Sequence, residues 1–374
     1  MPYVCTMDSH RLDVAACVVD GGIVPGDVEI ADGRIAAVGC EPAGAEGLAA
    51  PGLVDVHVHG CAGVDFLTAD EDGYHVAGER LLAAGVTACQ PAFVCAPEEQ
   101  LTAALAVLGG IQGSGGPRFL GAHLEGPFLS ADKLGTHTPA YRRDPDVALL
   151  ERLIAAGPVS EVTLAPELPG ALDLVDLLVH QRLIASVGHT NATAAQASAA
   201  FDRGARSVTH LFNAMRILHH REPGTAGVAL ARGDVAIELI VDGHHLHPDV
   251  VRTVWRAAVG RIVLVTDGTA ASGMPDGTYR MGDIDLTVTH GAVRNPDGAL
   301  AGSALMLIDA VRNVHALGVP LEEAISAATE VPARLLRRDH LGQLRIGAIA
   351  DLVVLDDDLG IRATYVDGRR VFST

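Results

Sequence analysis

The segment LVDVHVH at residues 53–59 decides the fold, because it is the first of eight short apolar runs that end in polar residues. The others are GVTACQPAFV, RFLGAHLEG, VSEVTLAPE, LIASVGH, RSVTHLF, VAIELIVDG and RIVLVTDG. Alanine-rich stretches lie between many of these runs, and we expect helices at residues 70–84, 97–108, 146–156, 172–181, 192–203 and 248–259. Strand–helix units repeated in this way predict an α/β fold, a (β/α)8 barrel of the TIM type.

An open, doubly wound sheet is the alternative architecture. That fold would place a glycine-rich phosphate loop after the first strand. This chain has His57-Val58-His59 there instead. The sequence therefore favours the barrel.

The two ends of the chain differ from its middle. Asp32-Gly33 and Asp367-Gly368 are hairpin-turn signals between short alternating runs. We therefore expect one small β-sandwich domain assembled from both termini. The predicted divisions are residues 1–49 and 341–374 for this domain, and residues 50–340 for a metal-dependent hydrolase barrel.

Composition limits the partners of the chain. Its formal net charge of −19 repels phosphodiester backbones, and aromatic residues make up only 3% of it, so we expect no nucleic-acid partner. A local basic pocket can still bind a small phosphorylated molecule, because charges beyond ~8 Å are screened at physiological salt. The N-terminus lacks a signal-peptide pattern, and no apolar run reaches the ~18 residues of a membrane span. Six cysteines without a CxxC pair suit a reducing compartment, so we expect a cytoplasmic protein without a membrane partner.

Polar residues at the carboxyl ends of the strands are the candidate site, because barrel enzymes place their active sites there. His57 and His59 are two apart on an extended segment and therefore share a face. Four further candidates close other runs: Glu125, His189, His210 and Asp267. A lone histidine at a strand end is usually an ordinary polar residue, but six such residues are hard to produce by chance. Imidazole and carboxylate without thiolate predict a divalent metal, with zinc first and iron(II), manganese or cobalt as alternatives.

Eight motifs together resemble the N-acetylglucosamine-6-phosphate deacetylases of the amidohydrolase superfamily. They are APGLVDVHVHG, GAHLEGPFLS, KLGTHTPA, VGHTNAT, THLFNAM, REPGTAG, VDGHHLHP and LVTDGTAASG, and they run through nearly the whole chain. The resemblance implies metal-dependent hydrolysis of the N-acetyl group of N-acetyl-D-glucosamine 6-phosphate. The products would be D-glucosamine 6-phosphate and acetate, in amino-sugar catabolism.

The resemblance also implies roles for the candidate ligands. A primary metal would be held by Glu125, His189 and His210. His57 and His59 would help to hold a second metal, with Glu125 or Asp267 shared between the two. Some family members lack the second histidine of the pair and keep one metal, whereas this chain has both, so we expect one or two ions per subunit.

Two residues would carry the chemistry. Asp267 would act as general base towards water and then as acid towards the leaving amine, unless it is only a metal ligand. His137, in KLGTHTPA, would polarise the acetyl carbonyl; outside this motif it would read as a surface histidine. His123 shares a strand face with Glu125 and is a candidate for orienting the ligands.

The phosphate would be bound by Asn213, the backbone at Ala214, Arg221 and His245. In the family the arginine can come from the neighbouring subunit, which implies a homodimer with Arg221 acting across the interface. The alternative for Arg221 is a solvated loop cation. Arginine suits a phosphate because its planar fork of donors matches the phosphate oxygens.

The sequence disfavours two other functions. Cyclic amidases of the same superfamily usually need a carboxylated lysine, but this chain has Glu125 at the third strand and its nearest lysine, Lys133, in the loop beyond. A non-catalytic scaffold protein on the same fold would be expected to lose metal ligands, and this chain keeps the full set.

Overall fold

Eight parallel strands form the barrel, and this confirms the predicted fold class. The computed structural model describes residues 9–111 and 116–374. In ladder order the strands are β7 (Leu53–Val58), β10 (Val86–Phe93), β12 (Ala122–Glu125), β13 (Val159–Leu164), β14 (Ile184–Val187), β15 (Ser207–Val208), β16 (Ala236–Leu239) and β17 (Ile262–Leu264). The third predicted run is split, because β11 (Arg118–Phe119) precedes β12 and also pairs with β10.

Hydrogen bonds between the first and eighth strand regions close the barrel, and we call this junction the seam. At the carboxyl end, Asp267 N donates to His57 O (2.9 Å) and His59 N donates to Gly268 O (2.7 Å). At the amino end, the carbonyls of Ala327 and Ala328 accept from β17 and β7 at 2.8 Å each. The seam therefore brings the histidine pair of the first strand against Asp267.

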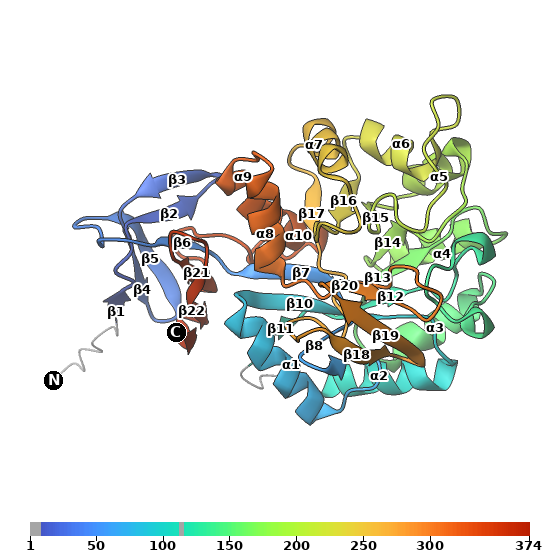
Figure 1. Ribbon diagram of the computed structural model, residues 1–374, viewed down its shortest axis with the longest axis horizontal. Coiled ribbons are helices and arrows are strands. Elements are labelled where there is room, and N and C mark those ends of the chain that lie inside the picture. Colours follow the sequence, from blue (N-terminus) through green and yellow to red (C-terminus); the bar gives the residue numbers. More distant parts are fainter. Residues whose placement is uncertain (1–8, 112–115) are drawn as a thin grey trace.

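Helices surround the strands (Figure 1). The six predicted helices are present as α1 (Glu71–Ala83), α2 (Glu98–Gly110), α3 (Val147–Ala156), α4 (Ala171–His180), α5 (Ala194–Asp202) and α7 (Pro248–Ala257). Side-chain caps fix four of their starts: Asp70 and Asp146 each accept from a backbone N–H three residues on, Thr193 forms a capping box with Gln196, and His247 accepts from Asp249 N. Four further helices were not predicted: α6 (Gly224–Ala231), α8 (Leu307–Ala316), α9 (Leu321–Ser326) and α10 (Glu330–Leu335).

The small domain beside the barrel draws strands from both ends of the chain, as expected for the predicted sandwich (Figure 1). One sheet has the order β1 (Ser9–Arg11), β4 (Asp27–Ala31), β5 (Arg34–Cys40). The other has the order β23 (Arg369–Ser373), β22 (Ile361–Val366), β21 (Leu352–Leu355), β6 (Leu48–Pro51), β2 (Ala16–Val19), β3 (Gly22–Pro25). Their facing side chains share one core, which includes Ile30, Ile35, Cys17 and Leu352.

Both predicted hairpins are present. Asp32-Gly33 joins β4 to β5, and Asp367-Gly368 joins β22 to β23. All four residues have φ between 51° and 75°, the left-handed conformation that a tight hairpin turn requires. Aspartate and glycine adopt it more readily than most residues, which explains why this local signal was reliable.

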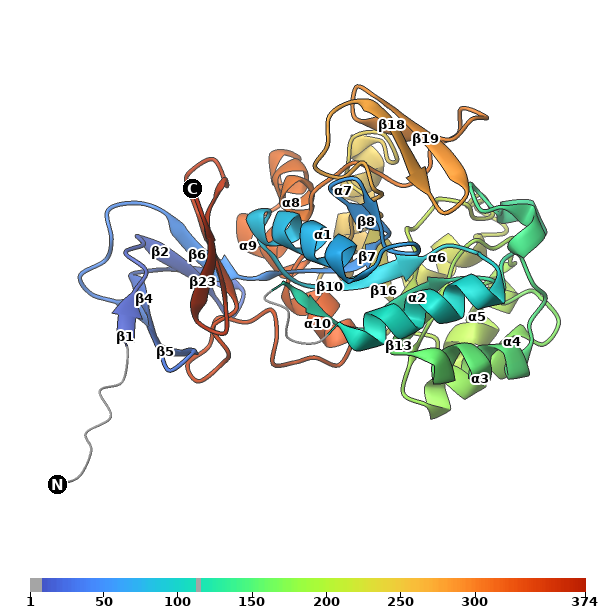
Figure 2. The same cartoon turned by 90° about the horizontal axis from the view of Figure 1, so that it is seen from below.

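A three-stranded sheet that the sequence did not predict lies over one end of the barrel (Figure 2). Its strands are β18 (Gly277–Met281), β19 (Ile284–Thr289) and β20 (Ala292–Arg294). Asp65, at the end of β9 (Val64–Asp65), which pairs with β8 (Gly60–Cys61), accepts from Gly282 N at 2.6 Å. The tip of the sheet is thus held close to the first strand of the barrel.

The described residues include five of the six cysteines. The five cysteines from Cys17 onward are free thiols. Cys5 and the rest of the N-terminal segment 1–8 lie outside the described residues. None of the helices formed by residues 9–111 and 116–374 has the length and apolar character needed to cross a membrane.

Candidate metal centre and active site

The six candidate residues at the strand ends converge on one rim of the barrel. They are His57, His59, Glu125, His189, His210 and Asp267, and all are buried. Three of these are non-glycine residues with positive φ, at 46° (His189), 30° (His210) and 47° (Asp267). Such residues cost of order 1–3 kcal/mol each and cluster at functional sites, where the surrounding structure holds them. Here the unusual backbone turns each side chain into the barrel mouth as the strand ends.

Glu125 lies at the centre of the cluster. Its Oε1 lies 3.0 Å from His189 Nε2 and 2.9 Å from His210 Nε2, and its Oε2 lies 3.2 Å from His59 Nε2. Two sets of potential ligand atoms that include Glu125 lie within 4.8 Å of one another: Glu125, His189 and His210 in the first, and His57, His59 and Glu125 in the second. A third group with the same spacing consists of His57, His123 and Glu238. Asp267 Oδ1 lies 3.2 Å from His59 Nε2 and 3.5 Å from His57 Nε2.

The hydrogen bonds of three imidazoles indicate that this cluster fits a metal. Nδ1 of His59 donates to the Ala92 carbonyl (3.0 Å), and Nδ1 of His189 donates to the Lys133 carbonyl (2.9 Å). Nδ1 of His57 lies 3.1 Å from Glu238 Oε2. Because a carbonyl can only accept, the neutral rings of His59 and His189 have a bare lone pair on Nε2, directed at carboxylate oxygens. A proton or a cation must therefore lie between these atoms.

The spacing of the nitrogen atoms also suits a metal. His189 Nε2 and His210 Nε2 lie 3.1 Å apart, and His57 Nε2 and His59 Nε2 lie 3.2 Å apart. Zinc–nitrogen bonds of about 2.0–2.1 Å in a tetrahedron separate neighbouring donors by about 3.4 Å. Nitrogen and oxygen donors without thiolate are suited to borderline divalent ions. The residues present thus fit one or two such ions.

The electrostatics of the cluster favour positive charge. Burial lowers the pKa of His59, but hydrogen bonds to Asp267 and Glu125 outweigh this effect and raise it to about 9. His57 is affected in the same way, and its pKa lies well above the usual value. Burial raises the pKa of Glu125, but its interactions with the surrounding imidazoles outweigh this effect and hold the pKa well below the usual value, so the carboxylate stays ionised. Without a metal, the field of the carboxylates holds protons on imidazoles that would otherwise bind a cation.

His137 differs from the proposed ligands. It lies between the 3-10 turns Ala131–Lys133 and Pro139–Tyr141, and its Nδ1 accepts from Cys95 N at 3.1 Å. The N–H of the neutral ring is therefore on Nε2, 3.2 Å from Glu125 Oε2. Burial lowers the pKa of His137 to about 4, despite the nearby Glu125, so the ring is neutral at pH 7. His137 thus offers a hydrogen-bond donor to the site.

A cavity of about 710 Å³ opens above the cluster. His137 and Asp267 line it beside the proposed ligands, and Met281 contributes from the unpredicted sheet. Asn213, Ala214 and His245 also line it. Arg221 does not: it lies on the exposed segment 217–221, and its guanidinium contacts His220. The chain therefore brings three of the four predicted phosphate-binding residues to its own cavity.

His245 is held by a neighbouring carboxylate. Asp242 Oδ2 accepts from its Nδ1 at 2.8 Å, and Asp242 Oδ1 accepts from the backbone N–H groups of His244 and His245. Burial lowers the pKa of His245, but the hydrogen bond and charge of Asp242 outweigh it and raise the pKa above the usual value. Asp242 therefore favours the cationic form of His245 at the predicted phosphate end of the cavity.

The interior polar residues below the rim were missed by the sequence reasoning. Glu238 on β16 and Asp55 on β7 are both fully buried. Each is a charged residue inside an apolar run, VAIELIVDG or LVDVHVH, and that signal could have identified them. Asp55 accepts from Thr266 Oγ1 at 2.6 Å, although burial raises its pKa to about 6.

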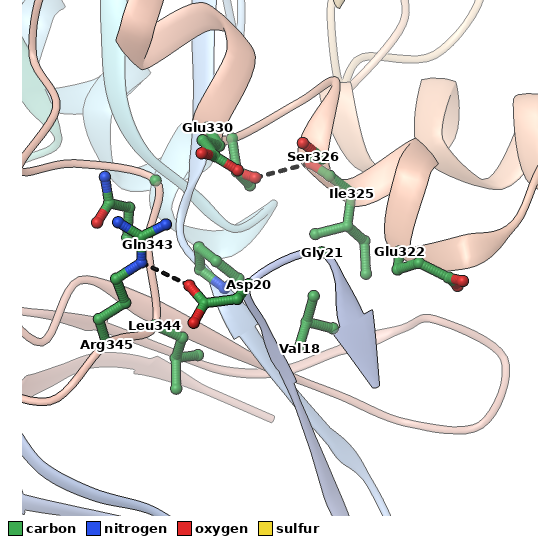
Figure 3. Close-up of a pocket in the computed structure, with 13 residues that line it drawn as sticks. Val18, Asp20, Gly21, Glu322, Ile325, Ser326, Glu330, Gln343, Leu344 and Arg345 are labelled. Carbon is green, nitrogen blue, oxygen red and sulfur yellow. Dashed lines mark hydrogen bonds and ion pairs between the residues drawn. The ribbon is translucent and has the colours of Figure 1, made fainter. Parts of the chain in front are cut away.

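A second cavity lies at the opposite end of the barrel, where β7 begins (Figure 3). It is bounded by the terminal sheets and by α9 and α10, and its volume is about 330 Å³. An ion pair between Arg345 and Asp20 (2.6 Å) crosses one side of it. The amino ends of barrel strands are associated with stability rather than catalysis. This cavity is therefore not the candidate active site.

The closed barrel with a shared carboxylate among imidazoles defines a class, the metal-dependent hydrolases of the TIM-barrel type. Residues 48–371 match the model of the Amidohydrolase family, so the chain belongs to that family. N-acetylglucosamine-6-phosphate deacetylase from Vibrio furnissii is 38% identical over 86% of this chain and 82% of its own length. N-acetylgalactosamine-6-phosphate deacetylase from Escherichia coli O157:H7 is 39% identical over 94% of this chain and 96% of its own.

Solved structures support the assignment of the chain to this family. A mutant of N-acetyl-D-glucosamine-6-phosphate deacetylase from Mycobacterium smegmatis, in complex with N-acetyl-D-glucosamine-6-phosphate, superimposes with a TM-score of 0.92 at 36% identity. The alignment covers 98% of this chain and all of that one. The Thermotoga maritima enzyme of the same name gives a TM-score of 0.90 at 33% identity, with the same coverage. The resemblance inferred from the sequence motifs is confirmed.

Proposed function

We propose that the protein hydrolyses the N-acetyl group of N-acetyl-D-glucosamine 6-phosphate, giving D-glucosamine 6-phosphate and acetate. One observation carries the proposal: imidazoles that offer lone pairs, a histidine that offers an N–H and an ionised aspartate all face one cavity. The names of the relatives support the choice of substrate. A cyclic amidase and a scaffold protein are both disfavoured, because Glu125 stands where the amidase would need lysine and the ligand set is complete.

The chemistry divides among the residues of the site. A divalent ion bound there would polarise the acetyl carbonyl and lower the pKa of water towards about 7. His137 donates its Nε2–H to the acetyl oxygen and stabilises the negative charge that develops on it. Asp267 accepts a proton from the attacking water. Hydrogen bonds and charge from His59 and His57 lower its pKa despite its burial, so it is ready to do so. Asp267 then protonates the amine nitrogen as the carbon–nitrogen bond breaks.

The primary ion is assigned to Glu125, His189 and His210, and the second to His57 and His59 with Glu125 or Asp267 shared. Zinc is the first expectation because three-ligand sites of this composition suit it. The decisive experiment is to measure acetate release from N-acetylglucosamine with and without the 6-phosphate, after chelation and metal add-back. Release that depends on both the metal and the phosphate is expected. Activity that is indifferent to the phosphate would refute the assignment of His245 and Arg221.

The 4-epimer is a second candidate substrate. It is favoured by the relative from Escherichia coli O157:H7, which is named as a deacetylase of N-acetylgalactosamine 6-phosphate and matches almost the whole chain. The values of kcat/KM for the two sugar phosphates, measured side by side, separate the candidates. A higher value for the galacto epimer would overturn the choice of the gluco substrate.

The phosphate is assigned to His245, Asn213, the backbone N–H of Ala214 and Arg221. In the present conformation the Asn213 amide donates to the His210 carbonyl at 3.1 Å, so it must be redirected to reach a phosphate oxygen. We assign Arg221 to the cavity of a second copy of the chain. Ile217 and Leu218 beside it are 84% and 41% exposed, as expected for an apolar loop that a homodimer covers. A cytoplasmic location remains a prediction.

Replacement of Arg221 by alanine should raise KM about 10- to 100-fold with a smaller change in kcat, because a charge-assisted hydrogen bond to phosphate contributes about 1.5–3 kcal/mol. Arg203→Ala is the matched control, since Arg203 pairs with Asp176 on the outer helices. Mixing R221A subunits with D267N subunits should restore turnover at low substrate concentration, which neither variant shows alone. A mixed dimer would contain one site with both groups intact. Absence of this complementation would place Arg221 in its own subunit's site or outside any site.

Binding of the sugar phosphate should weaken as the pH rises through the pKa of His245. The cation is the form that attracts phosphate, and Asp242 holds this pKa above about 6.5, the usual value for histidine. KM should therefore rise on the alkaline side. In Asp242→Asn, the rise should begin at lower pH because the stabilising charge is gone. Identical pH profiles of KM for the two proteins would contradict the role of Asp242.

A further inference from the structure

Glu238 lies inside the barrel, one layer below the rim, on β16. Its side chain has no exposed surface, and its Oε2 contacts two of the proposed metal-binding residues. It lies 3.1 Å from His57 Nδ1, and it accepts from the backbone N–H of His210 at 3.3 Å. One carboxylate oxygen thus touches a member of each ligand set.

We propose that Glu238 is a positioning residue for the second metal site, where it fixes the tautomer and the direction of the His57 ring. With its proton on Nδ1, the ring presents the lone pair of Nε2 towards Glu125 and Asp267, which lie 3.7 and 3.5 Å away. The proposal rests on the metal-dependent function proposed above. It adds a residue outside the ligand set on which the binding of one particular ion depends.

The contact between Glu238 and His57 matters because the other proposed ligands have hydrogen-bond partners of a different kind. His59 and His189 are oriented by backbone carbonyls, which remain whatever side chains surround them. Of these three rings, only that of His57 is oriented by a side chain, and a carboxylate partner makes an imidazole a stronger ligand. His57 is therefore the ligand most sensitive to a single substitution beneath the rim.

Two neighbours could compete for this role, and their contacts exclude them. Asp55 accepts from Thr266 and from the backbone N–H of His57, so it holds the strand and not the ring. His123 packs its ring 4.4 Å from the His57 ring, but its Nε2 is bound to Thr163 Oγ1 at 2.7 Å. The sequence-based suggestion that His123 orients the ligands is thus better fulfilled by Glu238.

Glu161 on β13 provides a matched control. It is also fully buried within the barrel, and within the described part of the chain its two carboxylate oxygens have no hydrogen-bond partner. Burial, followed by the charge of Glu238, raises the pKa of Glu161 well above the usual value, which favours its neutral form. Glu161→Gln therefore changes a buried carboxyl on a neighbouring part of the barrel interior without removing a hydrogen bond to His57.

The experiment is a zinc titration of metal-free full-length protein against a chromophoric chelator, for the wild type, Glu238→Gln and Glu161→Gln. Wild type and E161Q are expected to bind two ions per chain. E238Q should keep the tighter ion and bind the other about 10- to 100-fold more weakly, the usual effect of losing a partner of a ligating histidine. Glutamine can still accept from the His210 N–H, so the first site should be retained.

Several results would overturn the proposal: unchanged affinity at both sites of E238Q, equal weakening of both sites, or the same loss in E161Q. A wild type that binds one zinc ion would also overturn it, while leaving the proposed deacetylase activity intact. If E238Q fails to fold, Glu238→Asp and the ring nitrogen-15 spectrum of zinc-loaded wild type take its place. The His57 signal, assigned with His57→Asn, should show a protonated Nδ1 and a metal-bound Nε2. The opposite pattern would refute the assignment.

Discussion

Asp267→Asn should abolish turnover while leaving most of the metal bound. Asparagine keeps the shape of the side chain but cannot accept a proton from water and return it to the leaving amine. General acid–base groups contribute about 10²–10⁴-fold, and Asp267 is proposed to act in both directions, so kcat should fall towards the upper end of that range. Asparagine also tolerates positive φ, so the backbone at 47° need not move.

The measurement pairs single-turnover rates with metal analysis of the same preparation. Asp249→Asn, at the exposed start of α7, is the control and should behave as wild type. Near-normal activity in D267N would remove Asp267 from the mechanism. Loss of both activity and most of the metal would indicate that Asp267 acts only as a metal ligand. Its position allows this, because its Oδ1 lies within 3.5 Å of Nε2 of both His57 and His59.

Glu125→Gln should release the metal and remove activity together. The carboxylate of Glu125 belongs to both ligand sets, so one substitution weakens both sites. A bound ion supplies several kcal/mol of transition-state stabilisation, so kcat/KM should fall by a factor of about 10³ or more. Metal content after dialysis against chelator, compared with Glu161→Gln, checks the result. A variant that keeps its full metal content would show that Glu125 is not a shared ligand.

Most of the fold could be predicted because its signals are local. The eight apolar runs, the capped helix starts and the two Asp-Gly hairpins each depend on a few neighbouring residues. Once a barrel is inferred, the polar residue that ends each strand is placed at the common rim by topology alone. That reasoning brought together Glu125, His189 and His210 from segments far apart in the chain.

Other features depend on long-range contacts and were not predictable. The sheet formed by β18, β19 and β20 interrupts the alternation after the eighth strand, and its position depends on a contact between Gly282 and Asp65. Helix α6, GTAGVALA, has no polar face to mark its period. The tautomers of the histidines depend on carbonyls distant in the chain, such as Ala92 O.

The seam of the barrel has a consequence for the durability of the enzyme. The backbone bonds that join the first and eighth strand regions are made by His57, His59, Asp267 and Gly268 themselves. Thermal opening of the barrel along this line would pull apart the proposed metal ligands, so inactivation by heat and loss of the metal should be a single event. An excess of free metal would then protect the protein against heat, because an ion that binds only the closed form stabilises it by mass action.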